Sequence, residues 1–382
     1  MLGRFLRACP VFLWAAGHVL PVQAELPVEQ ITVAQLPPAS PYRLYFTDLA
    51  LPHLPDGRLY VIDGRTLKLE GVLSTGSFAQ TTLAPDRSEI YAVTTYFSKL
   101  NRGERHEEID VFDAATLKLK AEIPYPARHV QALPSVATMR TSADGRFILI
   151  QNATPATSVS IVDRRLEKMV AEVPTPGCFG VYPAKSVNRF ATLCGDGTML
   201  TVTYDKDGNP IGKKKSARFF DPDDDALFTP GAQAGDVYHF LSFKGNWQSV
   251  NIAQEAAVAE PFWPMVTPKD AKQGWRPGGT QPLALHVDSG IAYVTMHPKG
   301  AEGSHKNPAH EIWVFDVAGK TRLSRVKAHD ISGLAVTQGS TPRLFAFAIE
   351  RPAITVFEGG SRLKKVLSGS VPGDTPTLLE TQ

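Results

Sequence analysis

One short pattern recurs along this chain of 382 residues and constrains its fold more than any other feature. In this pattern an apolar run ends in an acidic residue, and a second apolar run follows a few residues later. Asp63, Asp113 and Asp163 fall 50 residues apart, and the same pattern recurs at Asp316 and Glu358. A fixed period of this size is typical of one supersecondary unit stacked against copies of itself. The pattern therefore predicts a repeat architecture.

Each period contains two apolar segments joined by a hairpin-like loop. Turn motifs such as Ala143-Asp144-Gly145 and Gly195-Asp196-Gly197 bound these segments. Seven units of about 50 residues, with no long helical period, predict an all-β fold, a seven-bladed β-propeller, over a sandwich or barrel. The predicted strand pairs are 42–47 with 58–63, 89–95 with 108–113, 145–151 with 158–163, 189–194 with 199–204, 236–243 with 247–252, 290–296 with 311–316, and 343–349 with 353–358.

The first 24 residues have the character of a signal peptide. Two arginines precede a mostly apolar stretch from Ala8 to Val22, and small residues ending at Ala24 offer a cleavage site. The apolar stretch is short for a membrane span and contains two prolines. We therefore expect cleavage near Ala24, an exported and soluble protein without a membrane segment, an N-terminal arm over 25–41 and the propeller over 42–382.

The charge balance bears on possible partners. The formal net charge is +2, which is too small for an electrostatic nucleic-acid binder. The basic run Lys213–Lys215 follows a turn-like segment and fits a solvated hairpin edge, with a docking patch as the alternative. No nucleic-acid partner is expected.

Two cysteines, Cys178 and Cys194, remain once Cys9 leaves with the signal peptide. An even pair in an oxidising compartment favours a disulfide, and the alternative is two buried free thiols. Two cysteines alone make a poor zinc site, and no histidine pair lies beside them at ligand spacing. We expect a disulfide and no metal.

No catalytic set is evident in this chain. The nucleophile elbow, the P-loop and the dinucleotide-binding glycine pattern are all absent. Asp221–Asp225 resembles the start of a calcium loop but lacks its glycine and terminal glutamate, so a solvated acidic turn is the simpler interpretation. His297, His305 and His310 match no metal-binding spacing and fit loop histidines with backbone partners.

Two irregular segments interrupt the repeat, namely a long loop at 96–107 and an insertion at about 261–282. Loops longer than a hairpin needs are where function concentrates. Both segments carry aromatic residues, which either form a partner surface or substrate mouth, or pack as small satellite cores. These aromatic residues are Tyr96, Phe97, Phe262, Trp263 and Trp275.

Several runs, taken together and in this order, resemble the heavy subunit of the quinoprotein amine dehydrogenases. The runs span about residues 43 to 358, and those at 151–158 and 296–306 are more similar to the aromatic (aralkyl) amine branch than to the methylamine branch. The matching runs are Thr94–Arg105 with Ile109–Asp113, Gln151–Ser158, Gly177–Phe179 with Leu193–Gly197, Gly274–Gly279, and Met296–Lys306 with Glu311–Asp316.

The resemblance implies a seven-bladed propeller that pairs with a small light subunit in an α2β2 complex. In this family the light subunit carries tryptophan tryptophylquinone, formed from two of its own tryptophans. The complex oxidises a primary amine to an aldehyde and ammonia in the periplasm, and a blue copper protein accepts the electrons. The catalytic base and the quinone belong to the light subunit, so no catalytic residue is expected in this chain.

The resemblance also assigns particular residues. In the methylamine branch an aromatic residue of the second-blade loop borders the substrate channel, and the matching position here is Phe97, next to Tyr96. The aromatic branch has a histidine at this position, so Phe97 departs from that branch. We expect Phe97 and Tyr96 to lie at the substrate channel or the light-subunit contact. Cys178 and Cys194 also match a family disulfide.

Two other classes of protein fit a propeller with a signal peptide. One is a stand-alone periplasmic binding or scaffold protein of the YVTN-repeat or lactonase-like type. The other is a hydrolase with a metal in the central channel, although the predicted inner strands offer no ring of ligands. A neighbouring gene for a small, exported, cysteine-rich light subunit would favour the dehydrogenase.

Overall fold

The computed structural model describes residues 35–382 except residue 127. The predicted signal peptide, residues 1–24, and residues 25–34 of the predicted arm lie outside the described residues. Residues 35–41 form no strand, but the Leu36 amide donates to the Ala115 carbonyl oxygen and its side chain packs on the core. None of the described helices is long and apolar enough to cross a membrane.

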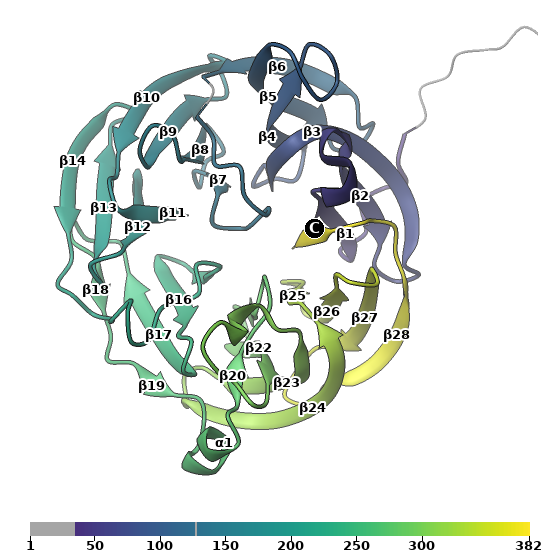
Figure 1. Ribbon diagram of the computed structural model, residues 1–382, viewed down its shortest axis with the longest axis vertical. Helices are drawn as coiled ribbons and strands as arrows, with labels where there is room; N and C mark the ends of the chain where they lie inside the picture. Colours follow the sequence, from purple (N-terminus) through teal and green to yellow (C-terminus); the bar gives the residue numbers. More distant parts are fainter. Residues whose placement is uncertain (1–34, 127) are drawn as a thin grey trace, which may run out of the picture. The chain divides into compact units, whose positions relative to one another are not determined.

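Residues 35–382 form a ring of seven antiparallel sheets, the blades, with the first strand of each blade nearest the centre (Figure 1). The predicted all-β propeller is confirmed. Blade 1 contains β29 (Pro376–Thr381), β1 (Arg43–Asp48), β2 (Gly57–Asp63) and the first half of β3 (Lys68–Leu83), and blade 2 contains the second half of β3, β4 (Glu89–Phe97), β5 (Arg105–Asp113) and β6 (Leu119–Tyr125). Blade 3 contains β7 (Met139–Thr141), β8 (Phe147–Asn152), β9 (Ser158–Asp163) and β10 (Lys168–Pro174). Blade 4 contains β11 (Cys178–Pro183), β12 (Arg189–Cys194), β13 (Met199–Tyr204) and β14 (Pro210–Lys215).

The remaining three blades follow the same order. Blade 5 contains β15 (Ala232–Ala234), β16 (Val237–Leu241), β17 (Asn246–Asn251), β18 (Val258–Ala259) and β19 (Trp263–Pro264). Blade 6 contains β20 (Arg276–Pro277), β21 (Leu283–His286), β22 (Ile291–His297), β23 (Ala309–Asp316) and β24 (Thr321–Ile331). Blade 7 contains β25 (Gly333–Val336), β26 (Arg343–Ala348), β27 (Ala353–Glu358) and β28 (Lys364–Ser370). Short helices are η1 (Leu51–Asp56), α1 (Pro268–Lys272) and η2 (Ser304–Lys306).

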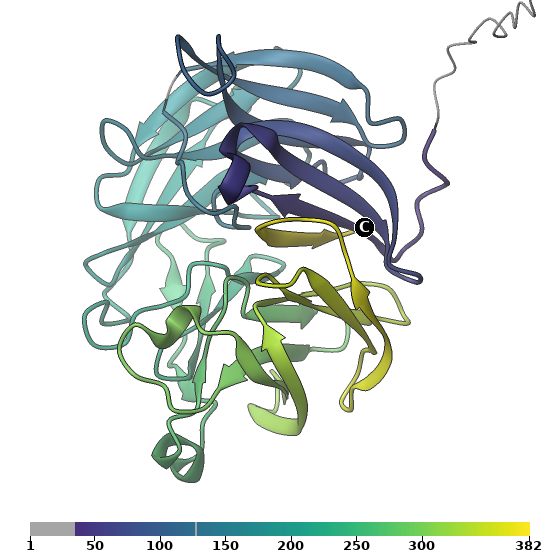
Figure 2. The same cartoon turned by 45° about the vertical axis from the view of Figure 1, so that its right-hand side comes forward.

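Blades 1 and 2 share one long strand, and blade 1 closes the ring. Strand β3 pairs with β2 up to Gly76 and with β4 from Ser77 onward, so one backbone runs through both blades. The C-terminal β29 pairs with β1, the first strand of the ring (Figure 2). The two ends of the propeller are therefore held together by a ladder of backbone hydrogen bonds.

The hydrophobic core lies between neighbouring blades. Between blades 2 and 3, for example, Tyr91 and Val93 of β4 pack in one buried cluster with Ile148 and Ile150 of β8. Alternate side chains of a strand point to opposite faces, so each inner strand contributes to the core on both of its sides. Each blade thus buries its faces against its neighbours, as a stacked repeat requires.

The repeated acidic residue that dominates the sequence ends the third strand of a blade and caps the following turn. Asp63 accepts a hydrogen bond from the Arg65 amide, Asp113 from the Thr116 amide and Asp163 from the Arg165 amide. The fourth residue after each aspartate has a positive φ, at Leu67 (58°), Leu117 (56°) and Glu167 (52°). A carboxylate that accepts local amides favours such turns. The repeat therefore has a structural role.

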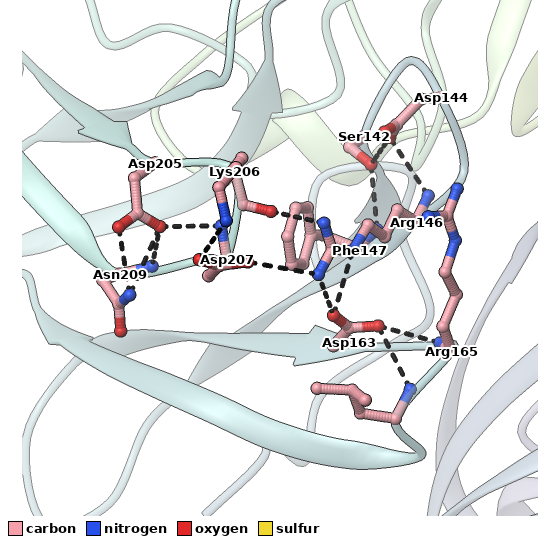
Figure 3. A network of polar contacts seen from close by, with 11 residues as sticks. Ser142, Asp144, Arg146, Phe147, Asp163, Arg165, Asp205, Lys206, Asp207 and Asn209 are labelled. Carbon is pink, nitrogen blue, oxygen red and sulfur yellow. Dashed lines mark hydrogen bonds and ion pairs between the residues drawn. The ribbon is translucent and has the colours of Figure 1, made fainter.

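At Asp163 the same carboxylate also links two blades. Figure 3 shows Arg146 of blade 3 between Asp163 and the β13–β14 turn of blade 4. The Arg146 guanidinium donates to Asp163 Oδ2 at 3.0 and 2.8 Å and to the Lys206 carbonyl oxygen, and it lies 3.8 Å from Asp207 Oδ1. Burial opposes ionisation of Asp163, but the hydrogen bonds from Arg146 and the backbone amides outweigh it and lower the pKa of Asp163.

The predicted disulfide is present in the structure. Cys178 and Cys194 are joined directly across the β11–β12 pair, and both are buried. The basic run Lys213–Lys215 forms exposed positions of the edge strand β14, as the predicted hairpin edge requires.

We predict unequal effects for two of the repeated aspartates. Asp163→Ala should lower the free energy of unfolding by roughly 2–4 kcal/mol, because it leaves Arg146 without its buried partner. Asp113→Ala removes hydrogen bonds within one turn and should cost about 1 kcal/mol. Urea denaturation of both variants measures the difference, and equal shifts in the two midpoints would contradict the interblade role of Asp163.

We also predict that the disulfide stabilises the fold. The double variant Cys178→Ser/Cys194→Ser should lose about 3 kcal/mol, the chain-entropy value for a loop of this length, since the two cysteines are 16 residues apart. Thermal unfolding of the variant and the parent, with free thiols counted in the non-reduced parent, provides the measurement. Two free thiols in the parent would refute the bond.

Candidate functional site

The irregular segments of the sequence come together on one face of the ring. Strands alternate in direction within a blade, so the loops after second strands and the connections between blades emerge on the same side. We call this side the loop face. It includes the segments 98–104, 128–138, 261–282 and 298–308, with α1 at the outer rim (Figure 1).

An open cavity of about 590 Å³ lies on the loop face. Five connections of the loop face contribute to its lining, including 216–231 and 242–245, and most of the lining surface is apolar. His305 and Lys306 add polar groups from the loop between β22 and β23. Other lining residues are Leu133, Phe228, Phe243 and Thr280. A largely apolar hollow with a few polar groups is typical of a ligand or partner site.

The second-blade loop is shorter than predicted. The sequence predicted a loop at 96–107, but β4 extends to Phe97 and β5 begins at Arg105, with these two residues paired across the ladder. The loop therefore comprises residues 98–104. The residues at the two ends of the predicted loop pair with each other and so extend the ladder between β4 and β5. Their mixed polar sequence lacks the alternation typical of a strand, so the sequence alone does not reveal this pairing.

Phe97 and Tyr96 project from opposite faces of β4, because they are adjacent on one strand. Tyr96 points into the cleft between blades 1 and 2, where its hydroxyl group donates to Asp110 Oδ2 at 2.7 Å. Phe97 lies half-buried at the end of β4 on the loop face and does not line the 590 Å³ cavity. The structure thus separates two residues that sequence reasoning had grouped.

A buried carboxylate, Glu107, anchors the loop end of this hairpin. Glu107 Oε2 accepts from His129 Nδ1 at 2.7 Å and from the Arg128 amide at 3.0 Å, and Glu107 Oε1 pairs with Arg105. Burial raises the pKa of Glu107, but hydrogen bonds from His129 and Arg105 outweigh this effect and keep the pKa below its ordinary value. Gln131 adds a hydrogen bond to the Thr95 hydroxyl group at 2.9 Å.

This network joins the end of β4 to the connection 128–138, which supplies Leu133 to the cavity. The sequence analysis missed it, because Glu107 and His129 are 22 positions apart and neither lies in a motif. Only the folded ladder brings them together.

The two tryptophans of the insertion, Trp263 and Trp275, are buried in one hydrophobic cluster, so the packing interpretation holds for them. Trp263 stacks on Trp247 with ring centroids 5.6 Å apart. The Arg325 guanidinium lies 4.5 Å from the Trp275 ring centroid and donates to Asp270 Oδ1 at 3.0 Å. By contrast, the Phe262 side chain is 60% exposed.

The histidines and the acidic turn show no sign of a metal site. Within the described part of the chain no three His, Cys, Asp or Glu side chains converge as metal ligands. His297 is buried and its Nδ1 lies 3.1 Å from the Pro298 carbonyl oxygen, while His305 lies on the exposed loop. Asp221 accepts from the Asp223 and Asp224 amides, which makes this segment an acidic turn.

Comparison with known proteins gives consistent matches. The family model for "Methylamine dehydrogenase heavy chain (MADH)" matches residues 41–381. The methylamine dehydrogenase heavy chain of Methylophilus methylotrophus is 26% identical over 333 residues, covering 86% of this chain and 81% of that protein. The heavy chain of Methylobacillus flagellatus is 27% identical over 334 residues, covering 86% and 82%.

Solved structures support the architecture alone. The β-propeller domain of Cps50 (Swd1) from Myceliophteria thermophila superposes with a TM-score of 0.54 at 8% identity, covering 86% of this chain and 98% of that domain. At such low identity the likeness concerns the fold and carries no function.

The matched region spans the whole ring, from the residues before β1 to the end of β29, and so includes every blade and the loop face. This chain belongs to the methylamine dehydrogenase heavy chain family and is similar to the heavy chain of a quinoprotein amine dehydrogenase.

Proposed function

We propose that this chain is the heavy subunit of an exported amine dehydrogenase that oxidises a primary amine to an aldehyde and ammonia. The observation that carries the proposal is the family match across the entire propeller, from residue 41 to residue 381. A small light subunit would supply tryptophan tryptophylquinone, which accepts electrons from the amine. The heavy subunit would bind the light subunit in an α2β2 complex and help to form the substrate channel.

The loop face provides the surface that this role needs. Its cavity has an apolar lining that can exclude water around an amine or an inserted side chain. The Glu107–His129 pair and the Asp270–Arg325 pair hold two of its surrounding segments in place. A rigid face of this kind suits a subunit that positions a partner and does not itself carry catalytic residues.

We further propose that the amine is of the aralkyl class, that a blue copper protein accepts the electrons and that the complex works in the periplasm. The runs 151–158 and 296–306 support the amine class, since they resemble the aromatic branch. Both end on the loop face, and the second contributes Glu302, His305 and Lys306 to the cavity. The signal peptide expected over residues 1–24 supports export.

The first test separates assembly from catalysis. The purified single chain should fold, since its blades bury one another, but it should show no amine-dependent dye reduction. Co-expression with the light subunit from the same genome should yield a complex that reduces the dye with 2-phenylethylamine at a higher kcat/KM than with methylamine. Dye reduction by the single chain would refute the assignment of catalysis to the light subunit, and a preference for methylamine would refute the aralkyl proposal.

The second test concerns Phe97. A side chain at the border of a substrate channel discriminates amines by shape, and one buried methylene is worth about 1–3 kcal/mol in such discrimination. Phe97→Ala in the assembled complex should therefore change the ratio of kcat/KM for 2-phenylethylamine and methylamine by about tenfold. The control is Val187→Ala, an exposed side chain in a loop on the opposite side of the ring. An unchanged ratio in Phe97→Ala would withdraw the channel role.

A further inference from the structure

The loop end of the β4–β5 hairpin has no hydrophobic core of its own. Every residue from Ser98 to His106 is exposed, and Phe97 is half-buried. The orientation of this end therefore depends on the buried residues directly beneath it, Thr95 and Glu107, which lie opposite each other in the ladder. Because the proposed channel role of Phe97 requires a fixed position, these two buried residues bear on that role.

Strand register places Phe97 on the same face of the sheet as Glu107. Phe97 lies directly opposite Arg105, and Thr95 lies directly opposite Glu107. Residues two apart on a strand, and residues paired across a ladder, project from one face. This is the face that Val93 buries against blade 3. Phe97 is therefore one residue pair further toward the loop than Glu107, whose side chain is 0% exposed.

The Glu107 carboxylate accepts hydrogen bonds at both of its oxygens. Oε2 accepts from His129 Nδ1 at 2.7 Å and from the Arg128 and His129 amides at 3.0 and 3.3 Å. Oε1 accepts from the Arg105 guanidinium and, at 3.4 Å, from the Thr95 hydroxyl group. A glutamine cannot replace this arrangement, because its NH2 group would face donors on one side. The site therefore requires a carboxylate.

His129 extends the contact from the hairpin to two further elements. Its Nε2 atom lies 3.3 Å from the Phe78 carbonyl oxygen in β3, so both ring nitrogens face acceptors and the imidazolium form can donate to both. Its backbone forms a bridge with Asn152 at the end of β8, and the Val130 amide donates to the Gln151 carbonyl oxygen at 3.0 Å. His129 thus joins the hairpin of blade 2 to blade 3.

The same connection continues to the cavity on the loop face. Residues 128–130 contact Glu107 and β8, and the segment 133–135 lines the cavity. Between them, Gln131 donates to Thr95 Oγ1 at 2.9 Å. One buried carboxylate therefore holds both the end of the hairpin and a connection that forms part of the cavity.

We propose that Glu107 and His129 are positioning residues for amine selection, which fix Phe97 and the segment 133–135 relative to each other. This inference rests on the proposed function, in particular on the channel role of Phe97. Neither Glu107 nor His129 lines the cavity, so both act through the residues that they hold. A displacement of about 1 Å at a group that contacts substrate can change a rate by about 10²-fold, even when the mutation lies elsewhere.

Hydrogen exchange of the purified single chain tests the coupling without any partner. Glu107→Gln should speed amide exchange in 98–104 and 128–133 by about tenfold or more, because loss of one acceptor releases both segments. Glu89→Gln is the matched control. Glu89 is also a buried glutamate of blade 2 and accepts from Arg164 at 2.9 Å, but it lies at the opposite end of β4. This control should leave exchange in both segments as it is in the parent.

Kinetics of the assembled complex test the selectivity. Glu107→Gln should change the ratio of kcat/KM for 2-phenylethylamine and methylamine in the same direction as Phe97→Ala, by about threefold or more. The double variant Phe97→Ala/Glu107→Gln should show the ratio of Phe97→Ala alone, because Glu107 acts through Phe97. Glu89→Gln should lower stability yet keep the ratio of the parent. A merely structural role of Glu107 would lower kcat/KM equally for both amines.

Three results would overturn the proposal. They are parent-like exchange in either segment of Glu107→Gln, an unchanged amine ratio in an active Glu107→Gln complex, and ratio changes that multiply in the double variant. A parent complex that oxidises no amine is a different outcome, since the proposed function itself then fails and the role in selection fails with it.

A milder variant keeps the proposal testable if Glu107→Gln does not fold. Gln131→Ala removes an exposed side chain and its hydrogen bond to Thr95. It should change the exchange and the amine ratio in the same sense by about twofold, since one neutral hydrogen bond contributes less than a buried charged pair. Parent-like exchange together with a parent-like ratio in Gln131→Ala would count against the proposal.

Discussion

The pairing of the last strand with the first is the interaction on which the rest of the ring depends. Strand β29 forms a ladder with β1, and Asp48 at the end of β1 accepts hydrogen bonds from the Asp374 and Thr375 amides at 2.7 and 2.8 Å. Gln281, between β20 and β21 of blade 6, donates to the Leu379 carbonyl oxygen at 2.9 Å. Without this closure, blades 1 and 7 would expose their apolar faces and unpaired strand edges.

The junctions between blades contain buried ion pairs, whereas the loop face contains the irregular segments. At two junctions a buried charge is compensated within the chain, by Arg146 for Asp163 and by Arg164 for Glu89. At the junction of blades 1 and 2, Asp110 lies beside Glu108 and Glu122 and accepts a hydrogen bond from the Tyr96 hydroxyl group. The loop face collects the irregular segments, because the alternation of strands delivers them all to one side.

Much of the fold could be predicted from the sequence, because the second and third strands of each blade are long, apolar and bounded by turn residues. The pair 189–194 with 199–204 coincides with β12 and β13. The innermost strands were not predicted, and three of them, β7, β15 and β25, have only three or four residues, too few to show a period. Less of the candidate site follows from the sequence. The resemblance pointed to Tyr96 and Phe97 together, but adjacent strand residues face opposite ways. The contacts of Tyr96 with Asp110 and of Glu107 with His129 depend on strand register, which the sequence does not show.

We propose that this closed ring holds a smaller catalytic partner on its loop face. Native mass spectrometry of the chain purified from its own host tests this claim most directly. The account predicts a heterotetramer of two copies of this chain and two copies of a small subunit that carries the mass and absorbance of a tryptophan-derived quinone. A particle that contains only this chain, with no quinone absorbance, would contradict it.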